Sequence, residues 1–262
     1  MKKGFLLFTM SNLAAFASTI NPLNVRPATV GATWDTGAAM ITNCASIGAV
    51  NCELQSLINA LNGPSINVNT DQQTAGMWRL SGFNPSTSVR FRIEVTGAAT
   101  VQQLGIWSDA DMDTSTTADR TLINIFTGAA TNSAIAALSF DSLTGALTIT
   151  GGAGVNNVTN ATGINAGAFG FYLQTTIGGQ DFTLYSVDQL NPSGTAQALS
   201  FRNADQWFIG FEDIVRPAGD MDYNDLIFSI TDIEPVPEPG FYAVVGFGMA
   251  GLFWAHRRRA SS

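Results

Sequence analysis

Two acidic stretches of this 262-residue chain contain the side chains best suited to bind a ligand. The first occupies residues 109–113. The second begins at Glu212 and Asp213 and continues into a loop with four more oxygen-bearing side chains, Asp220, Asp222, Asn224 and Asp225. Alternate oxygen donors in a tight loop can turn toward one centre, and Ca²⁺ takes about six to eight such oxygens. The second stretch is therefore predicted to hold a structural calcium ion.

Both stretches also have a simpler interpretation as Asx turns in solvated loops, because short segments rich in Asp and Asn form such turns without any ligand. Neither stretch has the spacing of an EF-hand. Counted from Asp220, position six is Asp225 instead of glycine, and position twelve is Thr231 instead of glutamate. The calcium hypothesis favours the second stretch, which has more acids, and leaves the first stretch open.

The rest of the composition excludes most catalytic chemistry. The single histidine is His256, close to the C-terminus, and no lysine follows Lys3. Ser-His and Cys-His nucleophiles, His-based zinc sites and Schiff-base lysines are therefore excluded from the body of the chain. We expect a protein that is not an enzyme.

Two alternative functions stay open. A polysaccharide-binding module would stack aromatic side chains on sugar rings, although the same aromatics could fill a core; the candidates are Trp78, Trp107, Trp207 and Tyr223. A glycoside hydrolase would need two carboxylates that face a cleft, about 5 to 10 Å apart. Glu94 with Glu212 or Asp222 is one such combination, but no motif fixes the pair.

The charge of the body argues against nucleic acid as a partner. Seven basic residues stand against nineteen acidic ones between residues 18 and 235. Binding to phosphate requires a basic surface, so this composition favours cations over nucleic acids.

The acidic stretches must be positioned mostly by β-strands. One amphipathic helix is predicted at residues 54–61, capped by Asn51 and ended by Gly63 and Pro64. About ten short strands follow, the first at 89–95, where apolar and polar residues alternate. The others are predicted at 101–107, 122–127, 135–140, 146–150, 169–174, 182–187, 198–201, 207–211 and 226–231. Turns rich in Gly, Asn and Asp separate these strands, and no helix is available for parallel crossovers. The predicted fold is all-β, an antiparallel, jelly-roll-like β-sandwich with one short N-terminal helix.

The N-terminus has the order of a secretory signal peptide. Lys2 and Lys3 precede an apolar run, and Ala15-Phe16-Ala17 has the small-x-small form of a cleavage site. We expect cleavage after Ala17 or Ser18. Cys44 and Cys52 then fall in an oxidising compartment, where a disulfide is the natural interpretation and a metal-binding pair the less favoured one.

The C-terminus combines a proline-rich motif, an apolar segment and a basic cluster. The motif is Pro237-Glu238-Pro239, the apolar run covers residues 241–255, and the basic cluster consists of Arg257, Arg258 and Arg259. This run is short for a membrane span, but its flanks support a transmembrane helix with the arginines in the cytoplasm. The expected domains are a signal peptide at 1–18, an extracellular β-sandwich at 19–233, a linker at 234–240 and a transmembrane segment with a basic tail at 241–262.

This C-terminal arrangement resembles the PEP-CTERM sorting signal of Gram-negative bacteria that secrete exopolysaccharide. The resemblance implies that a membrane transpeptidase of the exosortase type is a partner. It also implies export to the cell envelope, with the protein either anchored by its C-terminal helix or released to the extracellular matrix, where exopolysaccharide would be a further partner.

A second resemblance covers roughly residues 165–232. The residues Phe211-Glu212-Asp213, a short spacer and Asp220-Met221-Asp222-Tyr223-Asn224-Asp225 are similar to the end signature of an uncharacterised extracellular domain that often precedes PEP-CTERM tails. The usual Gly-Gly before the first Asp is here Ala218-Gly219. The resemblance implies a secreted, calcium-binding β domain and gives no activity.

Overall fold

The computed structural model describes most of the central part of the chain. The described residues are 48–49, 52–62, 65–73, 76–82, 86–94, 102–109, 119–127, 134–215 and 221–236, with 86–94 described by their backbone alone. The predicted signal peptide, sorting motif and transmembrane segment lie outside these ranges. Among the described residues, no helix has the length and apolar character needed to cross a membrane.

The larger sheet has eight strands, and every neighbouring pair in it is antiparallel. In spatial order the strands are β1 (Gln72–Gln73), β11 (Ala198–Asn203), β12 (Gln206–Phe211), β13 (Leu226–Thr231), β3 (Ser86–Glu94), β6 (Ile135–Phe140), β7 (Leu147–Gly151) and β8 (Val158–Ala161). The sheet joins strands far apart in sequence, since β3 pairs with β13.

Four more strands form a second antiparallel sheet. In spatial order they are β10 (Gln180–Tyr185), β9 (Gly170–Ile177), β4 (Gln103–Asp109) and β5 (Arg120–Phe126). A short ribbon pairs β14 (Ile233–Pro235) with β2 (Trp78–Leu80). Two 3₁₀ turns, Asp188–Leu190 and Pro192–Gly194, connect β10 to β11.

The two larger sheets share one hydrophobic core. Side chains from both sheets point into it, as those of Phe171 of β9 and Phe228 of β13 do, with ring centroids 4.8 Å apart. Trp78 from the ribbon packs edge-to-face on Trp207 of β12 at 6.0 Å. Residues from both sheets thus exclude water from the same volume.

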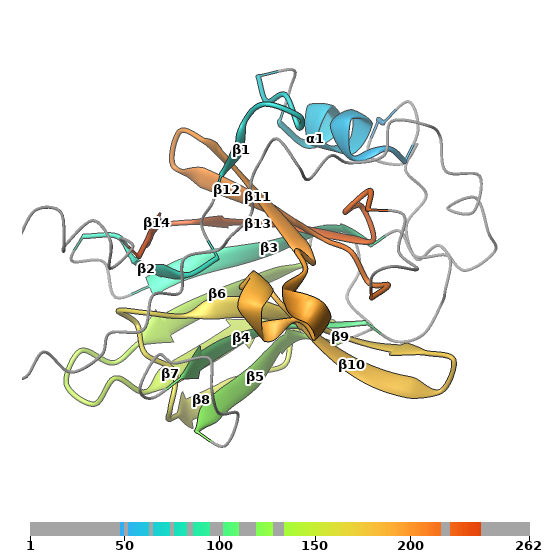
Figure 1. The fold of residues 1–262 in the computed structure, drawn as a ribbon. Helices are drawn as coiled ribbons and strands as arrows, with labels where there is room; N and C mark the ends of the chain where they lie inside the picture. The colour runs from blue at the N-terminus through green and yellow to red at the C-terminus, as the bar shows by residue number, and fades with distance from the viewer. Residues whose placement is uncertain are drawn as a thin grey trace, which may run out of the picture.

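The helix α1 (Leu54–Asn62) covers the other face of the eight-stranded sheet over β11, β12 and β13 (Figure 1). Its buried residues Leu54, Leu57 and Ile58 recur at helical spacing and pack on side chains of β11, β12 and β13. The predicted helix is confirmed in position and in its apolar face, while Asn51, its expected cap, lies outside the described residues.

The antiparallel, all-β prediction is confirmed by the described elements. Each of the ten predicted strands overlaps a strand of the structure. The strands that the sequence did not indicate are β1, β2 and β14, which have two or three residues each. Such strands are too short to show an alternating pattern, and partners distant in the sequence hold them in place. β14 also extends to Pro235, two residues beyond the expected end of the domain.

Candidate metal site

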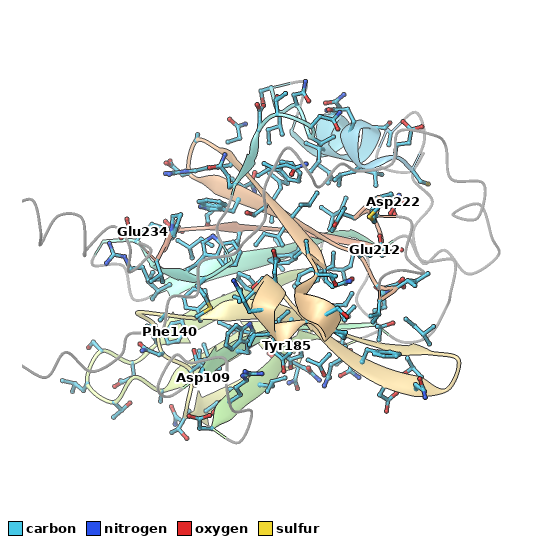
Figure 2. All side chains as sticks on the ribbon, in the orientation of Figure 1. Asp109, Phe140, Tyr185, Glu212, Asp222 and Glu234 are labelled. Carbon is cyan, nitrogen blue, oxygen red and sulfur yellow. The ribbon has the colours of Figure 1, made fainter. Side chains whose placement is uncertain are left out.

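The second acidic stretch lies at one end of the central strand pair β12 and β13. Phe211, the last residue of β12, faces Leu226, the first residue of β13. Glu212 and Asp213 therefore follow the end of β12, and Asp225 precedes the start of β13, at the same end of this strand pair. Figure 2 shows Glu212 and Asp222 together on this side of the molecule. The sheet register thus brings together acids that are twelve or more residues apart in the chain.

Three carboxylates of this stretch form a compact, buried group, called the acidic triad below: Glu212, Asp213 and Asp225. One oxygen from each lies within 4.8 Å of the others. Their exposed fractions are 1%, 1% and 0%. Water therefore does not screen their mutual repulsion, so something else must offset it.

The effect of this repulsion is seen in the pKa of Asp225. Burial raises the pKa of Asp225 well above its ordinary value of 3.8, and the charges of Asp213, Glu212 and Asp222 raise it further. The backbone N–H of Asp213 donates a hydrogen bond to Oδ2 of Asp225 at 2.8 Å, which acts in the opposite direction. Oδ1 of Asp225 is buried and accepts no hydrogen bond from any residue that the structure describes.

Asp222 and Asn224 hold the loop that leads into β13. The amide nitrogen Nδ2 of Asn224 donates to Oδ2 of Asp222 at 2.6 Å and to the backbone oxygen of Cys52 at 2.7 Å. Both side chains are buried. These contacts tie the loop to the start of α1, so Asp222 and Asn224 border the acidic triad and fix its position.

Tyr223 anchors the same loop in the core under α1. Its side chain is buried in the cluster that contains Leu54 and Leu57. Tyr223 and Met221 both have positive φ, 56° and 65°, which is unfavourable for residues with a Cβ. Gly210 leaves room for the close approach of this loop, because a Cβ there would lie 2.4 Å from the Tyr223 carbonyl oxygen. Packing against the sheet and helix holds the loop in this conformation.

A glutamine that the sequence analysis did not select reaches the acidic triad from the other sheet. Gln102, immediately before β4, donates from Nε2 to Oδ2 of Asp213 at 2.5 Å. It is 2% exposed. No sequence motif surrounds Gln102. Its contact with the triad depends on the tertiary structure, which places the start of β4 beside the end of β12.

The first acidic stretch is a separate feature. Asp109, at the end of β4, forms a buried ion pair with Arg120 of β5 at 3.1 Å. The Arg120 guanidinium also lies 5.5 Å from the ring centroid of Tyr185. Figure 2 places Asp109 well away from Glu212 and Asp222. Asp109 therefore has a basic partner of its own, while Asp111 and Asp113 lie outside the described residues.

The aromatic residues considered for sugar stacking are core residues. Their exposed fractions are between 0% and 1%; they are Trp78, Trp107, Trp207 and Tyr223. Trp107 and Trp207 also donate from their indole N–H groups to the backbone oxygens of Phe171 and Ile233. None of these four side chains offers a face to a glycan.

Several predicted residues lie outside the described part of the chain, namely Asp220, Cys44, Pro237, Glu238, Pro239, Arg257, Arg258 and Arg259. Cys52 is disulfide-bonded, and Cys44 is the only other cysteine of the chain.

Comparison with known families identifies two segments. A family model described as a domain of unknown function, DUF4114, matches residues 155–232. This segment contains β8 to β13 and ends just after the acidic triad. Its strands belong to both sheets and pair with β3, β4 and β7, so the folded unit extends beyond the match.

The second match is to the PEP-CTERM protein-sorting motif, over residues 235–259. No curated protein and no solved structure matches the chain. The motif marks an exported, envelope-associated protein that an exosortase processes. The chain is thus similar to the DUF4114 family over residues 155–232 and to the PEP-CTERM sorting motif directly after it.

Proposed function

We propose that this chain is a non-enzymatic protein of the cell envelope or extracellular matrix, in which the acidic triad binds one structural Ca²⁺. The ion links the end of β12 to the start of β13 and holds the loop beneath α1. The two larger sheets then act as the layers of a jelly-roll-like sandwich that the ion closes at one edge.

One observation carries this proposal. Asp225 is completely buried beside two other buried carboxylates, and its Oδ1 accepts no hydrogen bond from the described residues. A buried carboxylate oxygen without a donor is costly, unless a proton or a cation satisfies it.

The donor atoms favour calcium among the common cations. The triad offers only carboxylate oxygens, which suit hard cations such as Ca²⁺ and Mg²⁺ more than zinc or copper. The surrounding ligands come from separate strands and a loop, and such an arrangement tolerates the irregular geometry of Ca²⁺ better than the strict octahedron of Mg²⁺.

The same burial supports a non-enzymatic role. Glu212, Asp213 and Asp225 are at most 1% exposed, so a polysaccharide chain has no access to them. A glycosidase needs its two carboxyl groups on either side of a bound glycosidic bond. The buried aromatic residues likewise give no support to a glycan-stacking surface.

Processing of the termini decides between an anchored and a released protein. Mass spectrometry of the exported protein is expected to find an N-terminus after Ala17 or Ser18. A mature chain that still contains Arg257 to Arg259 would indicate anchoring, and loss of this cluster would indicate release.

Calcium binding is tested by isothermal titration of the full chain, purified in mild detergent and stripped with a chelator. We expect about one Ca²⁺ per chain, and Asp225→Asn should abolish this binding. Asp181→Asn, which removes an exposed charge on β10, is the matched control and should bind like the wild type. The proposal is wrong if the stripped wild-type chain takes up no Ca²⁺ at millimolar concentration.

A further inference from the structure

We propose that two buried glutamines, Gln102 and Gln197, supply neutral oxygen ligands to this ion and set its preference for Ca²⁺ over Mg²⁺. This inference rests on the proposed calcium site and names the residues that complete it. Gln197 lies directly before β11 in the same sheet as β12, and Gln102 lies directly before β4 in the other sheet.

Gln197 continues a row of side chains that crosses three strands. It lies directly before β11, and its backbone oxygen accepts a hydrogen bond from the N–H of Glu212 at 3.0 Å. Ala198 faces Phe211 and Phe211 faces Leu226, so the residues one step beyond these pairs are Gln197, Glu212 and Asp225. Facing residues in an antiparallel pair project from the same side, with Cβ atoms about 5 Å apart.

The side of the sheet is consistent for this row. Leu199 and Gly210, two residues away from Gln197 and Glu212, lie on the α1 side, where Leu199 joins the cluster beneath the helix and Gly210 faces Tyr223. Side chains alternate along a strand. The Gln197 side chain therefore projects to the same side as Glu212, within reach of the triad.

The Gln197 amide has an oxygen available in this position. The residue is 0% exposed, and its Nε2 donates to Oγ1 of Thr195 at 3.3 Å. Its Oε1 is buried and accepts no hydrogen bond within the described part of the chain. A buried amide oxygen without a donor is a destabilising feature by itself, and a cation beside Glu212 would satisfy it.

Gln102, which precedes β4 of the other sheet, also has a buried amide oxygen near the triad. Its Nε2 contacts Oδ2 of Asp213, which places the amide at the triad. Its Oε1 is also buried and has no donor among the described residues. A rotation of this amide exchanges the positions of its nitrogen and oxygen, so the same side chain can donate to Asp213 in the metal-free protein and ligate the ion in the loaded one.

Neutral ligands solve a problem of charge at this site. Three carboxylates already exceed the charge of one divalent ion, and a fourth would add repulsion inside the protein. Amide oxygens raise the number of ligands toward the six to eight that Ca²⁺ takes, without adding charge. Mg²⁺ needs fewer ligands and keeps several waters, so it gains less from the two glutamines.

The test compares Gln102→Met and Gln197→Met with the wild-type full chain. Methionine keeps the length and the unbranched shape of glutamine but offers no oxygen. Each substitution should weaken Ca²⁺ binding by about tenfold or more, the range seen for residues that support metal ligands. Mg²⁺ binding should change much less. Gln72→Met is the matched control, because Gln72 is a buried glutamine in β1 whose amide donates to the backbone oxygen of Val68.

A second measurement separates a ligand from a residue that only supports packing. Terbium(III) replaces Ca²⁺ in such sites, and its luminescence lifetimes in H₂O and D₂O count the waters bound to the ion. Each methionine variant should hold about one more water than the wild type, while Gln197→Glu, which restores an oxygen, should not. Tyr223, beside the site, can sensitise the emission.

The outcomes distinguish this inference from the proposed function. If the wild type binds neither Ca²⁺ nor terbium, the proposed site itself is wrong. If the wild type binds both ions, and the methionine variants bind Ca²⁺ with unchanged affinity or hold the ion with unchanged hydration, the site stands and the two glutamines are not its ligands. A variant that does not fold is recognised by its circular dichroism, and the remaining glutamine variant then decides.

Discussion

Replacing Asp225 by Asn should stabilise the metal-free protein and remove its response to Ca²⁺. The substitution removes one charge from three carboxylates that lie within 4.8 Å of one another. At an effective dielectric constant of about 20, each charged pair at this distance repels by about 3.5 kcal/mol. Asparagine keeps a carbonyl oxygen that can accept the hydrogen bond from the Asp213 N–H.

Protonation limits how large this effect can be. The buried carboxyl can take up a proton, which costs about 1.4 kcal/mol for each pH unit above the ordinary pKa of 3.8, or about 4 kcal/mol at pH 7. The gain from Asp225→Asn in the metal-free protein therefore cannot exceed about 4 kcal/mol. Ca²⁺ at a hundred times its dissociation constant should stabilise the wild type by about 2.7 kcal/mol.

Thermal unfolding of the full chain, with chelator and with Ca²⁺, measures both effects. In a protein of this size 1 kcal/mol corresponds to about 2 to 4 °C, so Ca²⁺ should raise the Tm of the wild type by about 5 to 10 °C. Asp225→Asn should start above the wild type in chelator and show no shift. If the variant is instead less stable than the wild type in chelator, or if both shift equally, buried charge repulsion at Asp225 does not explain this site.

The same carboxyl predicts a pH dependence for the metal-free protein. Because the pKa of Asp225 is raised in the folded state, the folded protein retains a proton that the unfolded chain releases above about pH 3.8. Stability should therefore fall as the pH rises from about 4 toward the raised pKa. Asp71 and Asp141 do not obscure this window, because hydrogen bonds from the backbone of Asn67 and Thr144 lower the pKa of these two acids. Asp225→Asn should lose this dependence in chemical denaturation at several pH values.

Two further substitutions test the frame around the site. Gly210→Ala places a methyl group 2.4 Å from the Tyr223 carbonyl oxygen. It should therefore lower the free energy of unfolding measured in urea by about 1 to 3 kcal/mol and weaken Ca²⁺ binding. Gly152→Ala is the control, because its methyl group meets no atom within 4 Å and should change neither quantity. Asp109→Ala leaves the buried Arg120 without its carboxylate, so it should destabilise the protein by about 3 to 5 kcal/mol. The number of Ca²⁺ bound in titration should not change, and a loss of bound Ca²⁺ would place Asp109 in the site after all.

The sequence predicted those parts of the fold that local patterns encode. The spacing of Leu54, Leu57 and Ile58 indicates a helix, and the alternation of apolar and polar residues at 89–95 indicates a strand, because both patterns repeat within a few residues. The ribbon of β2 and β14 has no such pattern. Its three-residue strands are held by pairing between residues about 150 positions apart, as between Leu80 and Ile233.

The candidate site was predictable in composition but not in geometry. The sequence identified the acids at 212–213 and 220–225 as one group, since they flank two apolar strands. It gave the alternating Asp222 and Asn224 the same weight as Asp225, although among the described residues the register of β12 and β13 groups Asp225 with Glu212 and Asp213. Which carboxylates converge depends on the pairing of strands, and this pairing is a tertiary property.

The arrangement of the site also explains why one ion could matter to the whole domain. The triad lies at the ends of two neighbouring strands, β12 and β13. Gln102, directly before β4 of the second sheet, donates a hydrogen bond to Asp213. Asn224 donates a hydrogen bond to the backbone oxygen of Cys52, just before the helix. Repulsion among the carboxylates would therefore act on both sheets and on the helix at once. A cation that removes this repulsion stabilises contacts between elements that no local sequence pattern connects, so its effect should appear in global unfolding instead of in the mobility of one loop.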